Sequence, residues 1–128
     1  MMRPLVVAAA VVERNGRFLL TRRQKGVQLE GLWEFPGGKC DSGESLHACL
    51  GRELQEELAV AVDVADEICT IVHEYPDRAV ELHFLRCSLL GDPTPQLGQE
   101  MRWVPRAELT ALQFPPADRE LIAKLTQP

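Results

Sequence analysis

The sequence contains no apolar run that could cross a membrane. A transmembrane helix needs about 20 consecutive apolar residues, and the apolar run at the N-terminus covers only Leu5–Val12. This run imitates a secretion signal, but Asn15-Gly16 follows it and is a strong β-hairpin signal. We therefore interpret the run as a buried strand, and we expect a cytoplasmic protein with no membrane partner.

Positive charge is also scarce. Lys and Arg total 14 against 19 Asp and Glu, which gives a net charge of −5. Polymeric DNA and RNA require a basic surface, so the charge balance argues against this class of partner. A single nucleotide is still compatible with an acidic protein, because a divalent cation can supply the opposite charge.

Cysteines with the spacing of a metal site are missing as well. The chain has four cysteines and no Cys-x-x-Cys pair, so the spacing predicts no structural zinc site. With no secretion signal, we expect reduced thiols that pack as small hydrophobic side chains. These cysteines are Cys40, Cys49, Cys69 and Cys87.

The length and composition are those of one globular domain. The 128 residues are 45% hydrophobic and 26% charged, so we expect a single domain over residues 1–128. Strands before and after a central helix, with a further helix at the end, predict an α/β protein whose mixed sheet is covered by helices. Residues 24–41 are predicted to be a loop. The expected strands are Leu5–Glu13, Arg17–Arg23, Ala61–His73, Ala79–Leu90 and Met101–Val104, and the expected helices are Ser45–Leu58 and Ala117–Leu125.

The central helix is expected to carry an acidic face. Its leucines recur every fourth residue and mark the buried side, while Glu53, Glu56 and Glu57 fall on a neighbouring arc. Glu53 and Glu57 repel each other at this spacing, and only Arg52 offers local compensation. The pattern is compatible with a solvated acidic surface, and equally with carboxylates that bind a divalent cation.

At this point the sequence resembles the Nudix family, whose glutamate-rich motif has fixed spacing. All but one of the defined motif positions match. The exception is Ala59, where the family has glycine in a left-handed conformation; alanine there costs about 1 kcal/mol, so we expect the helix to end differently by a residue. The matching residues are Gly38, Glu44, Arg52, Glu53, Leu54, Glu56, Glu57 and Val60.

Within that family the chain is most similar to the MutT-type enzymes and to CTP pyrophosphohydrolases. The similarity covers nearly the whole chain, in four further segments: Thr21–Arg23, Trp33–Pro36, Tyr75–Arg78 and Phe114–Asp118. The resemblance implies the Nudix fold, a mixed β-sheet sandwiched between α-helices.

The resemblance also implies roles for individual residues. Mg²⁺ or Mn²⁺ would be held by Glu53, Glu56, Glu57, the Gly37 carbonyl and Glu100, although Glu100 also reads as a plain surface residue. Glu53, Glu56, Arg52 and Glu44 would form the catalytic group, with Glu53 removing the proton and Arg52 and Glu44 orienting the carboxylates. Contacts to the substrate would come from Arg23, Phe35, Gly38, Lys39 and Asp118, among which Phe35 could instead pack in the core and Arg23 and Lys39 could simply lie on the surface.

Asp118 bears on the choice of base. MutT-type enzymes often carry asparagine at the matching position, which both donates and accepts hydrogen bonds, whereas an ionised aspartate only accepts. Burial could keep Asp118 protonated and restore a donor. Its alternative role is to cap the last helix.

The resemblance implies hydrolysis of a nucleoside triphosphate to monophosphate and pyrophosphate. The leading interpretation is an 8-oxo-dGTP diphosphatase that sanitises the nucleotide pool. Two alternatives are open, a pyrophosphohydrolase acting on CTP or dCTP and a nucleotide-binding Nudix module without catalysis. The expected partner is a small nucleotide, and the expected state is a monomer or homodimer.

Overall fold

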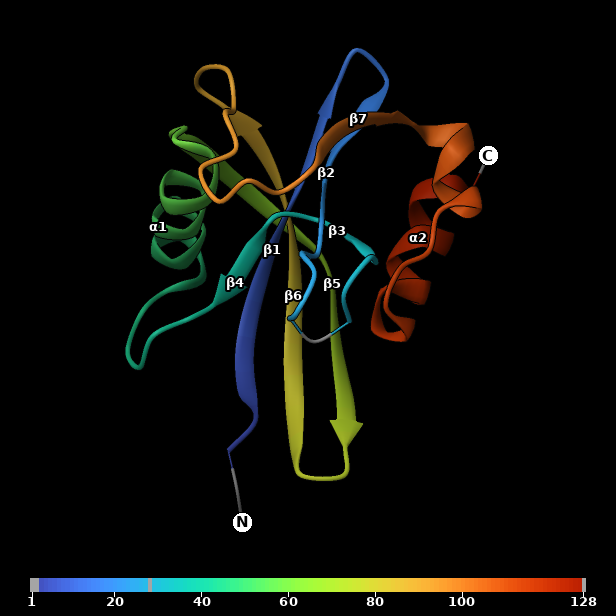
Figure 1. Ribbon diagram of the computed structural model, residues 1–128. Helices are drawn as coiled ribbons and strands as arrows, with labels where there is room; N and C mark the ends of the chain where they lie inside the picture. The colour runs from blue at the N-terminus through green and yellow to red at the C-terminus, as the bar shows by residue number, and fades with distance from the viewer. Residues whose placement is uncertain (1–2, 28, 128) are drawn as a thin grey trace.

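The computed structural model describes residues 3–27 and 29–127. One mixed sheet with seven strands forms the centre, and two α-helices and two short 3₁₀ helices cover it (Figure 1). The elements are β1 (Leu5–Arg14), β2 (Arg17–Arg22), β3 (Trp33–Glu34), β4 (Gly37–Lys39), α1 (Leu46–Leu58), β5 (Val62–Tyr75), β6 (Arg78–Leu89), β7 (Met101–Pro105), η1 (Arg106–Ala111), η2 (Pro116–Asp118) and α2 (Arg119–Thr126).

Strand β1 is the central strand of the sheet. It pairs in parallel with β6, from Leu5 opposite Val80 to Val12 opposite Cys87. It also pairs antiparallel with β2 at one end and with β4 at the other. Strands buried on both faces read as continuous apolar runs, and the N-terminal run has this position in the sheet.

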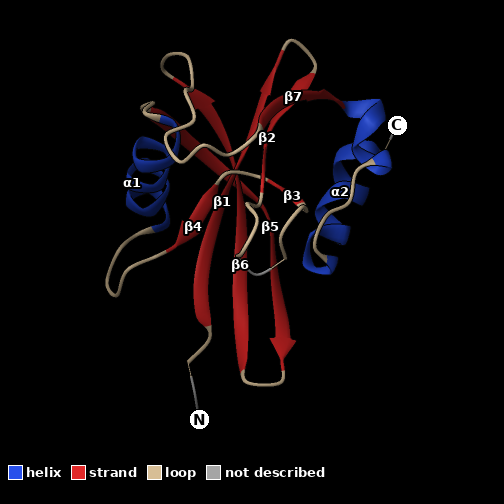
Figure 2. Ribbon diagram, viewed as in Figure 1, coloured by secondary structure: helices blue, strands red, loops and turns tan. Residues whose placement is uncertain are grey.

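The two helices lie on opposite faces of the sheet (Figure 2). On one face, Leu50, Leu54 and Leu58 of α1 are fully buried in one core cluster. On the other, Leu121 and Leu125 of α2 pack in a second cluster. The predicted α/β architecture with helices on both sides of a mixed sheet is confirmed.

Both ends of α1 have a defined cap. The Ser45 side chain accepts a hydrogen bond from the Ala48 N–H, as the sequence predicts for an N-cap. At the other end the expectation was wrong, because the helix still ends after Leu58 and Ala59 itself adopts the left-handed conformation, with φ 51° and ψ 42°. The helix end therefore stays where the family motif places it, and Ala59 adopts a backbone conformation that is strained for a residue with a Cβ atom.

The segment predicted as a loop contains two short strands. Strand β3 pairs with β2, and β4 pairs with β1. The prediction was wrong here because strands of two and three residues are too short to show an alternating pattern, and glycines are rare in strands. The consequence for the site is large, since β4 places Gly37 and Gly38 against the central strand.

The longer predicted strands are confirmed, with ends that differ by one or two residues. Asn15 and Gly16 both have positive φ, as the predicted hairpin between β1 and β2 requires. All four cysteines are buried free thiols, in line with the expectation from the sequence. Among residues 3–27 and 29–127, no helix is both long and apolar enough to span a lipid bilayer.

Candidate active site

Helix α1 brings its acidic face against strand β4. Burial of the leucines fixes the rotation of the helix about its axis, and the glutamates then fall beside the buried stripe. Glu53 is directed at Gly38: a Cβ atom placed on Gly38 would lie 2.5–2.7 Å from the Glu53 carboxyl atoms. Glu53 can therefore take this position only because residue 38 has no Cβ atom.

Gly37 holds the second contact between β4 and the acidic face. A side chain on Gly37 would collide with the Ala8 carbonyl of β1, so only glycine allows β4 to lie this close to the central strand. The Gly37 N–H donates a hydrogen bond to the Glu57 carboxylate. The two glycines thus fix where two of the three helix carboxylates lie.

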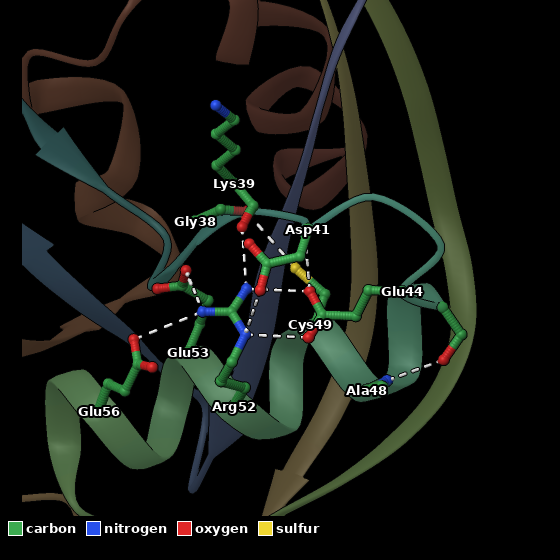
Figure 3. A network of polar contacts seen from close by, with 10 residues as sticks. Gly38, Lys39, Asp41, Glu44, Ala48, Cys49, Arg52, Glu53 and Glu56 are labelled. Carbon is green, nitrogen blue, oxygen red and sulfur yellow. Dashed lines mark hydrogen bonds and ion pairs between the residues drawn. The ribbon is translucent and has the colours of Figure 1, made fainter.

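Arg52 connects the glutamates of the loop and the helix (Figure 3). Its Nε donates to Glu44 Oε2 and its Nη2 to Glu44 Oε1, both at 2.9 Å. Its Nη1 donates to Glu53 Oε1 at 3.0 Å and to Glu56 Oε2 at 3.4 Å, and Nη2 also reaches the Lys39 carbonyl. The rigid guanidinium therefore joins the β4 loop, Glu44 and the helix carboxylates in one network.

The network leaves part of the negative charge without compensation. Hydrogen bonds from Arg52 and from the Asp41 backbone N–H hold the pKa of Glu44 at about 2. By contrast, burial and the negative charges of Glu53 and Glu34 raise the pKa of Glu57 to about 8. Burial also raises the pKa of Glu53, and Arg52 offsets this only in part.

This donor set fits a hard divalent cation. Mg²⁺ and Mn²⁺ prefer carboxylate and carbonyl oxygens, and a cation between half-buried carboxylates offsets both the desolvation and the repulsion that raise their pKa. The residues that could hold it are Glu53, Glu57 and the Gly37 carbonyl, with Glu56 further out, where its side chain is 59% exposed.

A cavity of about 400 Å³ opens beside these carboxylates. Glu53 and Glu57 line it together with the three residues of β4, three consecutive residues of β1 (Val7–Ala9) and alternate residues of β6 (Val80, Leu82 and Phe84). A single nucleotide fits a cavity of this size. All of the predicted contact residues, Arg23, Phe35, Gly38, Lys39 and Asp118, lie in its lining, as does the predicted metal ligand Gly37.

Asp118 is the buried acidic group in the wall of the cavity. It is only 5% exposed, and its carboxyl has no hydrogen bond to any other residue that the structure describes. It stands at the N-cap position of α2, but its side chain makes no cap hydrogen bond, so the alternative capping role is not realised. Burial, with the nearby charge of Glu34, raises the pKa of Asp118 to about 7.

Phe35 packs in the core and also reaches the cavity. Its ring is buried and stacks on Phe114 with the centroids 5.7 Å apart, and its edge meets Phe84. It also lines the cavity. The aromatic side chain is thus a fixed wall of the cavity and a part of the core.

Glu100 lies outside the group that the structure brings together. Its carboxylate forms an ion pair with Arg22 at 3.3 Å, its side chain is 50% exposed, and it is not among the described residues lining the cavity. Arg22 is therefore the ion-pair partner of Glu100 in this arrangement, and no side-chain hydrogen bond or ion pair among the described residues joins Glu100 to a glutamate of α1.

Three further polar residues, which sequence reasoning did not select, are among the described residues that line the cavity. Glu34 is half-buried and forms an ion pair with Arg23 at 2.9 Å. His73 and Tyr75 come from β5, with their rings in edge contact at 4.6 Å. The only sequence signal was their position in or next to segments that resemble MutT-type enzymes, and a lone histidine gives no signal of its own.

Comparison with known proteins agrees with this geometry. Residues 7–124 match the family described as the NUDIX domain. The chain is 38% identical over 121 residues to the 8-oxo-dGTP diphosphatase of Haemophilus influenzae, covering 93% of this chain and 89% of that one. It is 36% identical over 124 residues to the CTP pyrophosphohydrolase of Escherichia coli, covering 94% and 90%.

A solved structure has the same fold. The solution structure of the Escherichia coli ORF135 protein superimposes with a TM-score of 0.85 at 32% identity, and the match covers 95% of this chain and 88% of that one. The motif on α1, the glycines of β4 and the sandwich around the mixed sheet all lie within the matched residues. The chain belongs to the Nudix hydrolase family.

Proposed function

We propose that this protein hydrolyses a nucleoside triphosphate to the monophosphate and pyrophosphate with Mg²⁺, and that its substrate is 8-oxo-dGTP. The observation that carries the proposal is the pair of half-buried carboxylates, Glu53 and Glu57, in the lining of a cavity of nucleotide size. The name of the Haemophilus influenzae relative supports the substrate. The expected setting is the cytoplasm, and the expected state is a monomer or homodimer.

The metal would be held by the carboxylates of Glu53, Glu56 and Glu57 and the Gly37 carbonyl, and we include Glu100 as a further ligand from the loop before β7. Mn²⁺ would serve in place of Mg²⁺. Bound there, a divalent cation neutralises phosphate charge and activates water. For Glu100 to take part, its ion pair with Arg22 has to open.

The remaining steps belong to side chains of the chain itself. Glu53 is the residue we assign to proton removal, and Arg52 holds its carboxylate at 3.0 Å while the Cα of Gly38 leaves room for it. Glu44 acts as a positioning residue because it accepts two hydrogen bonds from Arg52. Lys39 and Arg23 supply positive charge at the cavity wall for the phosphate chain.

Base recognition is assigned to Asp118. Because its pKa is raised to about 7, both protonation states are populated near neutral pH. The protonated form donates to a base carbonyl, and the ionised form accepts from a base N–H. 8-Oxoguanine offers both kinds of group, including the N7–H that oxidation creates.

A second candidate is a pyrophosphohydrolase for CTP or dCTP. The relative from Escherichia coli with that name supports it, and an ionised Asp118 could accept from the amino group of cytosine. A nucleotide-binding module without catalysis is disfavoured by the carboxylates, since a mere binding protein has no need for side chains that repel one another.

One substrate panel tests these possibilities. Pyrophosphate release with Mg²⁺ is measured for 8-oxo-dGTP, dGTP, dCTP and CTP, for the natural chain and for Glu53→Gln and Asp118→Ala. We expect 8-oxo-dGTP to have the highest kcat/KM, Glu53→Gln to lose about 10²-fold or more in kcat, and Asp118→Ala to lower the preference for 8-oxo-dGTP over dGTP. Turnover that is unaffected by Glu53→Gln would remove Glu53 from the mechanism, and the highest kcat/KM with dCTP or CTP would favour the second candidate.

A further inference from the structure

Two cysteines lie close together beside Gly38, and neither is among the described residues that line the cavity. Cys40 follows β4 and Cys49 lies in the second turn of α1, and both are buried. Their sulfur atoms and a carboxylate oxygen of Glu44 all lie within 4.8 Å of one another. Figure 3 shows the Cys49 sulfur next to Glu44 and Gly38.

The donor atoms of these groups lie close together. The Cys49 thiol donates a hydrogen bond to the Gly38 carbonyl oxygen at 3.7 Å, and Cys40 and Glu44 are its other polar neighbours. Burial raises the pKa of both thiols, so the pair is neutral when nothing else is bound. A cation that displaces the thiol protons would find its ligands already turned toward a common point.

We propose that Cys40, Cys49 and Glu44 form a site for one Zn²⁺ ion, with the Gly38 carbonyl oxygen as the fourth ligand. Binding replaces the two thiol protons, which pass to solvent, with two zinc–sulfur bonds. In a tetrahedral zinc site the distance between a sulfur and an oxygen ligand is about 3.5 Å. The 3.7 Å between Cys49 and Gly38 is close to that value.

A divalent cation compensates most of the charge at this site. Two thiolates and one carboxylate carry three negative charges against its two positive ones, and the Arg52 guanidinium, which Glu44 shares with Glu53 and Glu56, lies beside the carboxylate. Glu44 can serve without giving up Arg52, because a carboxylate has about four acceptor positions. Arg52 and the Asp41 N–H occupy three of them, and the fourth faces Cys49.

Ligand chemistry separates this site from the carboxylates of the cavity. Thiolates select zinc over magnesium, whereas carboxylates and carbonyls suit magnesium. A zinc ion here would join the end of β4 to α1, the two elements that place Gly38 and Glu53. The site is thus expected to stabilise the fold; it shares Glu44 with the function proposed above, and the tests below measure metal binding and stability instead of turnover.

Titration with Co²⁺ tests the site, because cobalt bound by thiolates gives a charge-transfer absorption that carboxylate ligands do not give. For the natural chain we expect one equivalent with this absorption, removal by Zn²⁺, and a higher Tm with Zn²⁺. In Cys40→Ser and Cys49→Ser the affinity should fall by at least about tenfold, the smallest loss seen when even a hydrogen-bond partner of a metal ligand is removed. The matched controls, Cys69→Ser and Cys87→Ser, change buried cysteines outside the site and should bind as the natural chain does.

A second measurement uses the unchanged protein, in case the serine variants do not fold. Zn²⁺ should protect Cys40 and Cys49, and neither Cys69 nor Cys87, from alkylation by iodoacetamide, as read by peptide mass spectrometry. Absence of the thiolate absorption in the natural chain would overturn the proposal. So would an absorption that persists in both Cys40→Ser and Cys49→Ser, or alkylation that zinc does not slow.

Discussion

At the scale of single residues, the absence of a side chain at Gly38 is as important as any carboxylate. The Glu53 carboxyl occupies the space that a Cβ atom on residue 38 would need, so Gly38→Ala should displace this carboxyl. The fold should tolerate the change, because the displaced atoms are the flexible end of the Glu53 side chain. We expect kcat to fall by about 10²-fold with little change in Tm, as measured by pyrophosphate release and thermal unfolding.

Gly51→Ala is the matched control for that substitution. Gly51 lies in the middle of α1, and nothing stands within 4 Å of a Cβ atom placed on it. Alanine should therefore stabilise the helix by up to about 1 kcal/mol and leave turnover unchanged. Equal loss of activity in both variants would show that the position of Glu53 does not depend on the absence of a Cβ atom at residue 38.

Asp118 should make stability depend on pH. Its pKa is about 7 in the folded chain against 3.8 for an ordinary aspartate, so the folded state binds the proton more tightly. The stabilising effect is fully present below about pH 4 and is lost as pH rises to about 7. Asp118→Asn removes this loss, and we expect it to raise the unfolding free energy at pH 8 by on the order of 2 kcal/mol relative to the natural chain.

Urea unfolding of both proteins at pH 5 and pH 8 measures this effect. The two stability profiles should converge toward acidic pH and separate toward basic pH. A constant difference across the whole range would mean that the Asp118 carboxyl is ionised in the folded chain at all these pH values.

At the scale of elements, the end of α1 stores strain at one residue. Ala59 has left-handed backbone angles, which cost a residue with a Cβ atom about 1–2 kcal/mol, while glycine would lose about 0.4–1 kcal/mol more entropy on folding. Ala59→Gly should therefore stabilise the protein by about 0.5 kcal/mol, measured by denaturant unfolding. Ala48→Gly, at an exposed helical position of the same element, should destabilise it; stabilisation by both changes would contradict this account.

The elements also show what could be predicted from the sequence. The apolar run of β1, the leucine spacing of α1 and the hairpin at Asn15 each give a local signal, and each was predicted. Strands β3 and β4 were not predicted, because their pairing depends on partner strands elsewhere in the chain. The same holds for the site: spacing on one helix predicts the glutamates, but the meeting of Glu34 and Asp118 depends on tertiary packing.

At the scale of the whole molecule, the acidic cluster should couple stability to metal and pH. The pKa of Glu57 is about 8 and that of Glu53 is raised, so without metal the folded chain loses stability as pH rises toward 8, because both carboxylates become ionised. A bound cation removes that repulsion and competes with protons for the same oxygens. Mg²⁺ should thus raise Tm more at pH 8 than at pH 6, with a gain of about 2.7 kcal/mol when its concentration is 100 times its Kd.

Differential scanning calorimetry with and without Mg²⁺ at both pH values provides the measurement. Glu57→Gln is the control, because it removes the carboxylate with the highest pKa in the cluster. That variant should show a smaller response to Mg²⁺ with little dependence on pH. An equal response to Mg²⁺ at pH 6 and pH 8 in the natural chain would argue against metal binding by these groups.

The parallel pairing of β1 with β6 has a consequence for how the protein is made. Each rung of that pairing joins residues far apart in the sequence, from Leu5 with Val80 to Val12 with Cys87. Contacts of this kind slow folding, because a long loop must close before they form. During synthesis, the apolar first strand emerges from the ribosome long before its partner exists, so the nascent chain would depend on chaperones to shield that strand from aggregation until β6 has emerged.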